Sequence, residues 1–233
     1  MVVGITYTDE NMTTSAGVCH DSMRANGFDK AMIKTWADLS TEFRWFNKDI
    51  LPHKRGAGYW AWKAYLIYTW LLELNEGDIL IYSDAGCEWI DNPKHIIDVM
   101  DQDLFLFTSG HLHREWCKGD VLAITDKPDA LQVQASVIFI RVSDYSRRFI
   151  KEWLLWCQMP GLITDEPSIK PNHPDFREHR HDQAILTALA IREGIKLHWW
   201  PDAIWFQNQR HRWPDDKYPP MVRHHRKRNH EWA

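Results

Sequence analysis

One short apolar segment in the middle of the chain constrains its fold more than any other. Residues 78–83 (DILIYS) have the length and apolar content of a buried strand, and Asp84, Ala85 and Gly86 follow at once. In open α/β sheets, ligands bind beyond the carboxyl ends of the strands. An acid at such an end, beside two small residues, suits a metal ion or a sugar phosphate. Taken alone, Asp84 is equally compatible with a capped or solvated turn.

Strand-like and helix-like patterns alternate along the first half of the chain. Residues 60–74 have the length of a helix, and Gly77 favours an end to that helix before the strand at 78–83. This alternation predicts one α/β domain, Rossmann-like, with a mainly parallel central sheet flanked by helices. The other expected strands are 1–7, 31–36, 104–107, 133–142 and 195–200, and the other expected helices are 15–26, 39–50, 144–157 and 182–193.

The composition excludes several classes of protein. The 233 residues are 44% apolar, enough for a sizeable core, and the net charge of −4 gives no general reason to bind nucleic acid. No run reaches the roughly 18 apolar residues of a transmembrane segment, and no signal peptide is visible at the start. The four cysteines are scattered without a CxxC spacing, which argues against a zinc ribbon or a disulfide framework and favours a reducing, cytoplasmic location.

A basic, glycine-rich loop precedes the helix expected at 60–74. It reads Lys54, Arg55, Gly56, Ala57 and Gly58. Glycines let the backbone approach a ligand closely, and lysine and arginine favour phosphate. The loop does not match the Walker pattern, which excludes a P-loop ATPase. The alternative is a surface turn before an amphipathic helix.

Two further segments place polar side chains beside apolar ones. Gln134 and Ser136 precede a buried strand, where they can face a ligand or simply begin a core strand. Asp182 and Gln183 open the expected helix at 182–193. Asp182 can cap that helix, bind sugar hydroxyls or act as a general base.

The last two segments of the chain lack a regular pattern. Residues 160–179 form an expected loop whose length favours a role such as covering a site.

Residues 207–233 carry seven lysines and arginines and four histidines, which favours an anionic partner. Adjacent histidines suit a metal or a diphosphate, and arginines suit phosphate oxygens. The alternative is a disordered basic tail. The histidines and arginines in question are His224, His225, Arg210, Arg212, Arg223, Arg226 and Arg228, with Lys217 and Lys227 beside them.

The order of these segments resembles that in glycosyltransferases of the GT-A fold. Residues 54–67 look like the donor-binding helix, and 79–84 (ILIYSD) like the strand that ends in the Asp-X-Asp motif. Residues 134–137 (QASV) and 181–186 (HDQAIL) are similar to the later polar turn and the acidic helix start. The combination of GYWAWK and YSDAG is similar to a narrower group, the polysaccharide glycosyltransferases of bacteria and large viruses.

The resemblance implies a transfer of a hexose or pentose from a nucleotide-diphosphate sugar to a glycan or glycoconjugate acceptor. It implies residues 1–110 as a nucleotide-binding half and 111–233 as an acceptor half, within one domain. Asp84 and Asp182 are the implied catalytic residues, and Asp84, His224 and His225 would hold Mn²⁺ or Mg²⁺, hard cations that suit diphosphate oxygens. The implied donor-binding residues are Thr6, Tyr7, Lys54, Arg55, Lys63, Tyr82, Ser83, Gln134, Ser136, Gln183 and Arg226.

The chain departs from the family motif at one position. Residue 86 is glycine, where the motif has its second aspartate. Asp84 would then bind metal with a tail histidine, or basic residues would neutralise the diphosphate without a metal. Two rival functions remain open at this point: a metal-dependent hydrolase, for which the HExxH signature is missing, and a sugar- or nucleotide-binding protein without turnover.

Overall fold

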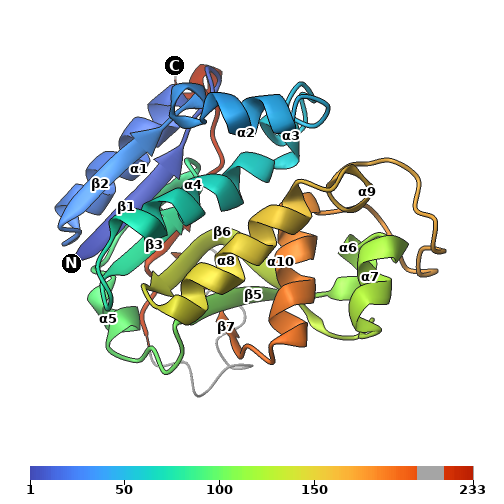
Figure 1. Cartoon of the computed structure of the whole chain (residues 1–233). Helices are drawn as coiled ribbons and strands as arrows, with labels where there is room; N and C mark the ends of the chain where they lie inside the picture. Colours follow the sequence, from blue (N-terminus) through green and yellow to red (C-terminus); the bar gives the residue numbers. More distant parts are fainter. Residues whose placement is uncertain (204–217, 233) are drawn as a thin grey trace.

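The computed structural model describes residues 1–203 and 218–232. Its centre is a six-stranded sheet in the order β2-β1-β3-β6-β5-β7, with a two-stranded sheet of β4 and β8 beside it (Figure 1). The strands are β1 (Val2–Tyr7), β2 (Lys30–Lys34), β3 (Ile79–Ser83), β4 (Cys87–Trp89), β5 (Leu104–Leu112), β6 (Leu131–Arg141), β7 (Leu197–Trp199) and β8 (Val222–His224).

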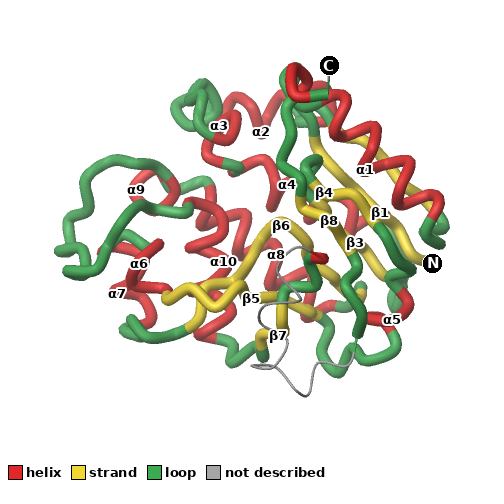
Figure 2. The backbone as a smooth tube through the Cα atoms, turned by 180° about the vertical axis from the view of Figure 1, so that it is seen from behind, coloured by secondary structure: helices red, strands yellow, loops and turns green. Residues whose placement is uncertain are grey.

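Helices cover both faces of the large sheet. In Figure 1, α4, α8 and α10 lie side by side over one face, and Figure 2 shows α1, β4 and β8 from the opposite side. The helices are α1 (Thr13–Ala25), α2 (Thr41–Phe46), α3 (Gly56–Tyr59), α4 (Ala61–Glu73), α5 (Lys94–Ile97), α6 (His113–Trp116), α7 (Gly119–Thr125), α8 (Asp144–Cys157), α9 (Pro160–Ile163) and α10 (His181–Arg192). Short 3-10 turns lie at Trp36–Asp38 and Asn229–Glu231.

Strand β3 separates two hydrophobic cores. Successive side chains of a strand point to opposite faces, so Leu80 and Tyr82 pack under α4 and α8 while Ile79 and Ile81 pack with α1 and the tail. All four are almost fully buried. This explains why the segment reads as a continuous apolar run rather than an alternating one.

The prediction of a single α/β domain with a mainly parallel sheet is confirmed. β1 pairs in parallel with β2 and β3, and β5 pairs in parallel with β7. β6 is the exception, because it runs antiparallel to both β3 and β5. Its early residues therefore lie beside the carboxyl end of β3, with Val137 opposite Ser83.

Some predicted elements differ in extent. The helix expected at 39–50 is only α2, because Ser40 Oγ accepts from Phe43 N at its start and Asn47 Nδ2 donates to Phe43 O at its end. Such local side-chain bonds compete with the helix. The loop expected at 160–179 begins with α9, and the tail expected to be irregular contains β8.

No helix in the two described stretches is long and apolar enough to cross a membrane. The tail residues Arg210, Arg212 and Lys217 lie outside the described residues.

Candidate active site

A buried lysine joins two carboxylates at the carboxyl edge of the sheet. Lys63, in the first turn of α4, is only 3% exposed. Its Nζ lies 2.9 Å from Asp182 Oδ2 and 3.3 Å from Asp84 Oδ1, and it donates to the carbonyl oxygen of Ala135 at 3.2 Å. A lysine ammonium has three N–H donors. All three therefore have a protein acceptor within reach.

The charges in this cluster depend on one another. Burial lowers the pKa of Lys63, but the neighbouring charges of Asp182 and Asp84 outweigh it, so the pKa is raised and the ammonium stays charged. Burial raises the pKa of Asp182 to about 6, although Lys63 pulls it down. Asp182 therefore changes its charge in the range where many enzymes operate.

Asp84 is the carboxylate that solvent reaches. Its side chain is 28% exposed, against 5% for Asp182. The Tyr82 hydroxyl donates to Asp84 Oδ1 at 2.6 Å, and the Asp84 N–H donates to the Ser136 carbonyl oxygen at 2.7 Å. Burial, together with the charge of Asp84, raises the pKa of Tyr82 well above its usual value, so its hydroxyl remains a donor.

Packing between α8, α10 and β6 fixes the position of Asp182. Trp153 Nε1, from α8, donates to the Asp182 carbonyl oxygen at 2.9 Å. The next side chain, Gln183, accepts from the Ala135 N–H at 3.4 Å. Ala135 thus links β6 to Lys63 through its carbonyl oxygen and to α10 through its N–H.

Backbone strain gathers around the same cluster. Tyr59, Trp60, His181 and Arg226 have φ values of 55°, 59°, 49° and 58°. Residues other than glycine seldom adopt this left-handed conformation, and such strain concentrates at functional sites. Tyr59 and Trp60 precede Lys63, and their rings lie 4.7 and 5.7 Å from that of His181.

The C-terminal tail packs directly against the turn after Asp84. β8 pairs with β4, and the N–H groups of His225 and Arg226 donate to the Gly86 carbonyl oxygen at 2.9 and 3.2 Å. A Cβ at residue 86 would come within 2.9 Å of Arg226 Cα. Residue 86 is glycine because the tail backbone occupies the space of a side chain.

The two tail histidines, at the end of β8 and just after it, have different surroundings. Burial, with the nearby charge of Arg226, lowers the pKa of His224 to about 4, and Asp84 acts on it in the opposite sense. His225 instead packs edge-on against Trp232 at 5.0 Å, and its Nδ1 accepts from the Lys227 N–H.

The residues present do not fit the metal site that the resemblance implies. Within residues 1–203 and 218–232, no three histidine, cysteine or acidic side chains are grouped so as to hold a metal ion. His225 lies against Trp232, and Asp84 Oδ1 is already engaged by Tyr82 and Lys63. Asp84, His224 and His225 therefore do not form one metal site. A requirement for Mn²⁺ or Mg²⁺ stays a prediction.

The remaining predicted donor-binding residues from β1 and β3 lie at the carboxyl edge of the sheet or are buried beneath it. Tyr7 ends β1 and stacks on Trp62 at 3.8 Å between ring centroids. Thr6 is buried one residue earlier. Ser83 is fully buried and accepts from Trp89 Nε1 at 3.3 Å, so its side chain serves the core rather than the surface.

The other predicted donor-binding residues lie in the loop before α3 and on β6. Arg55 pairs with Glu178 at 2.9 Å and with Asp165 at 3.7 Å, and so holds the 160–179 loop. Lys54 is exposed beside it. Gln134 and Ser136 lie on β6, with Ser136 Oγ donating to Gln134 Oε1 at 3.4 Å.

Two features of the site were missed from the sequence. One is the carbonyl oxygen of Ala135, for which no sequence signal exists because every residue has one. The other is Arg180, just before α10, which lies over the Trp116 ring at 4.4 Å. Its position directly before the acidic helix-start segment 181–186 was the only available signal.

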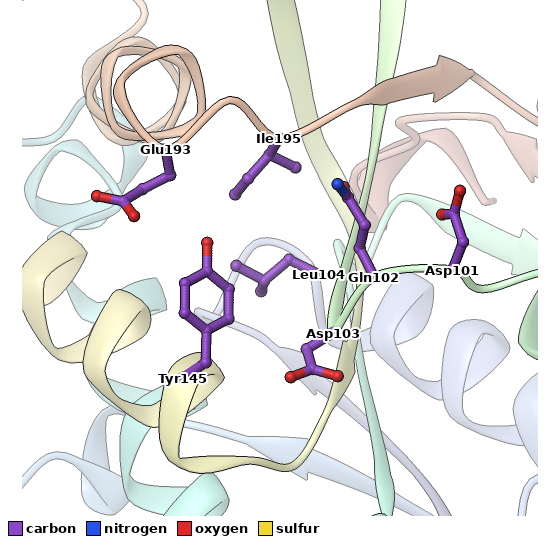
Figure 3. A pocket seen from close by; sticks show the side chains of 7 residues that line it. All are labelled: Asp101, Gln102, Asp103, Leu104, Tyr145, Glu193 and Ile195. Carbon is purple, nitrogen blue, oxygen red and sulfur yellow. The ribbon is translucent and has the colours of Figure 1, made fainter.

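A separate hollow of about 310 Å³ lies at the opposite edge of the sheet, near the start of β5 (Figure 3). Two of its polar side chains have protein partners: Ser143 Oγ donates to Asp103 Oδ2 at 2.6 Å, and the Lys196 N–H donates to Gln102 Oε1 at 3.1 Å. These bonds join the segment before β5 to the residues that precede α8 and β7, so the two side chains serve the scaffold.

The fold is that of the GT-A glycosyltransferases. The chain is similar to the galactosyltransferase LgtC in complex with donor and acceptor sugar analogues, with a TM-score of 0.55 and 16% identity over 97% of this chain and 87% of that one. It is also similar to mouse xyloside xylosyltransferase 1, with a TM-score of 0.51 and 10% identity over 96% of each chain.

A third similar structure is a glycosyltransferase involved in the glycosylation of the major capsid of PBCV-1. Its TM-score is 0.51, with 9% identity over 97% of this chain and 94% of that one. No protein-family model and no curated protein sequence matches this chain. At these identities the likeness establishes the fold.

Proposed function

We propose that the protein is a glycosyltransferase that moves a sugar from a nucleotide-diphosphate sugar to a glycan acceptor. One observation carries the proposal: Lys63 joins Asp84 and Asp182 at the carboxyl edge of a GT-A sheet. The desolvation cost of buried charges can exceed the attraction between them, so this cluster is not explained by stability alone. Ligands of open α/β sheets bind at this edge. The similar galactosyltransferase structure contains donor and acceptor sugar analogues, which supports the substrate class.

Asp84 is the carboxylate that we place against the substrate. It is the more exposed of the two, and the Tyr82 hydroxyl and Lys63 fix its orientation. A carboxylate held in this way can accept hydrogen bonds from sugar hydroxyls. Positioning of this kind lowers the entropy cost of reaching the transition state.

Asp182 acts on the substrate through Lys63. Its side chain is almost inaccessible, and its Oδ2 lies against the lysine ammonium. We therefore place it as a positioning residue, which keeps Lys63 charged and aligned with Asp84. Direct action as a base, or as a ligand of a sugar hydroxyl, would require the acceptor to reach a buried oxygen.

The nucleotide would bind beside the end of β1, where Tyr7 and Trp62 form a stacked aromatic pair. Gln134 and Ser136 would face the sugar from β6, since Ser136 is hydrogen-bonded to Asp84 through its backbone. The 160–179 loop, held by Arg55, would cover the bound donor and exclude water, which limits hydrolysis.

Release of a nucleoside diphosphate tests the proposal. The protein would be incubated with a panel of UDP-, GDP-, CDP-, ADP- and dTDP-sugars, each with Mn²⁺ and with EDTA, and the free diphosphate would be measured. We expect turnover of at least one donor. Asp84→Asn should lower it about 10- to 100-fold, the range for losing a hydrogen bond to a charged group.

The matched control is Asp98→Asn, an exposed acid paired with Lys94 on a distant helix, which should leave turnover unchanged. No turnover of any donor, together with no thermal stabilisation by any nucleoside diphosphate, would refute the proposed function. Binding without turnover would instead support a sugar- or nucleotide-binding protein.

A further inference from the structure

We propose that Arg226, with Arg180 beside it, holds the diphosphate of the donor without a bridging divalent metal. This inference rests on the proposed function and goes beyond it, because it assigns the diphosphate site and states what balances its charge. Three features of the structure support it: the close contact at Gly86, the arginines at this side of the site and the engagement of Asp84.

The close contact at Gly86 places Arg226 beside the turn that follows Asp84. The Arg226 N–H donates to the Gly86 carbonyl oxygen at 3.2 Å, and a Cβ on residue 86 would lie 2.9 Å from Arg226 Cα. A carboxylate side chain at residue 86 is thus incompatible with the tail in this position. The structure places the backbone of an arginine, Arg226, at the turn where a second acidic ligand would otherwise stand.

Arg55 and Arg180 lie together at this side of the site, and the charge of Arg226 acts on Arg180. Arg180 stacks on Trp116, and burial together with the charges of Arg55 and Arg226 lowers its pKa. Arg55 and Arg180 have Glu178 as a partner. Among the residues that the structure describes, no carboxylate lies within ion-pair distance of Arg226. Positive charges gathered in this way favour an anion, and guanidinium matches phosphate oxygens in a bidentate manner.

Asp84 is poorly suited to hold a metal in this arrangement. The Tyr82 hydroxyl lies 2.6 Å from its Oδ1, and the Lys63 ammonium lies 3.3 Å from the same oxygen. A divalent cation bound at Asp84 Oδ1 would compete there with the Lys63 ammonium and the Tyr82 hydroxyl. Lys63 supplies positive charge to Asp84 as well as to Asp182.

His224 is the third group at this side. An imidazole can donate an N–H to a phosphate oxygen. Its strand β8 is paired with β4 directly after Gly86, so it approaches the same turn as Arg226.

Calorimetric titration with nucleoside diphosphates tests the inference without relying on turnover. UDP, GDP, CDP, ADP and dTDP would each be titrated into the full chain in EDTA and in Mn²⁺. We expect at least one of them to bind in EDTA with a Kd within about threefold of that in Mn²⁺. Arg226→Gln should weaken this binding about 10- to 100-fold, the range for losing a hydrogen bond between charged groups.

Two more variants separate charge from structure. Arg228→Gln removes an exposed positive charge two residues further along the tail and should change the Kd less than about twofold. Gly86→Ala keeps every charge but forces the tail backbone away, so it should weaken binding in the same direction as Arg226→Gln. Circular dichroism would confirm that each variant is folded.

The outcomes distinguish this inference from the proposed function. Binding that occurs only with Mn²⁺, or that Arg226→Gln leaves unchanged, would overturn the inference and leave a glycosyltransferase in place. No binding of any diphosphate under either condition would count against both.

Discussion

At the scale of single residues, Lys63 determines the properties of the site. Its ammonium lies between Asp84 and Asp182 and contacts the carbonyl oxygen of Ala135. The charges of Asp182 and Asp84 in turn keep the pKa of Lys63 raised. Two predictions concern this cluster.

Lys63→Met should destabilise the protein by about 3 to 5 kcal/mol, because it leaves Asp182 buried without its partner. Urea denaturation monitored by circular dichroism would measure the free energy of unfolding. The matched control is Lys94→Met, which removes a lysine from an exposed pair with Asp98 and should cost at most about 1 kcal/mol. Equal effects of the two substitutions would show that Lys63 is not a structural link.

Asp182→Asn should change the pH dependence of turnover. Burial raises the pKa of Asp182 to about 6, so the carboxylate is charged above that pH and becomes protonated as the pH falls through it. Wild-type kcat/KM should therefore fall as the pH drops below about 6. The variant should lack this acidic limb and have kcat/KM lowered about 10- to 100-fold at pH 7.5.

Steady-state kinetics between pH 5 and 9 would give both profiles. An acidic limb that persists unchanged in Asp182→Asn would assign the titration to another group. A purely structural role for Asp182 would lower activity equally at every pH.

At the scale of secondary structure elements, the strand β8 brings the C-terminal tail to the site. It pairs with β4, which begins immediately after Gly86, and so places His224 and the Arg226 backbone beside the turn that follows Asp84. The tail is held there by buried apolar side chains, since Tyr218, Met221 and Val222 belong to the core under α1 and α5.

Met221→Ala should therefore lower stability by about 2 to 5 kcal/mol, the range for removing a large apolar side chain from a core. Met159→Ala is the control, because Met159 is 48% exposed and its loss should change stability by about 0.5 kcal/mol or less. Thermal denaturation and urea unfolding would measure both. A Met221 variant as stable as wild type would mean that the tail is not anchored in the core.

At the scale of the whole molecule, the direction of β6 brings the predicted site residues together. Because β6 runs antiparallel to β3, Gln134, Ala135 and Ser136 lie at the carboxyl end of β3. In a wholly parallel sheet those early residues would lie at the opposite edge. α10 packs across β6 (Figure 1), and its residue Asp182 lies 2.9 Å from Lys63 Nζ.

The sequence alone determined the class of fold and the segments that form the site. The apolar run at 78–83, its terminal acid and the alternation of strands and helices follow from side-chain burial and local periodicity, which are properties of neighbouring residues. The acidic helix start at Asp182 and the helix that carries Lys63 could be recognised for the same reason.

Only the tertiary structure decided how these segments combine. The pairing of Lys63 with both acids joins residues 21 and 119 positions apart in sequence, and the strand directions that allow it leave no local signal. The same holds for Gly86, which reads as a missing acid in the sequence. In the structure, the missing side chain at residue 86 leaves room for the tail backbone, because Arg226 packs against this glycine.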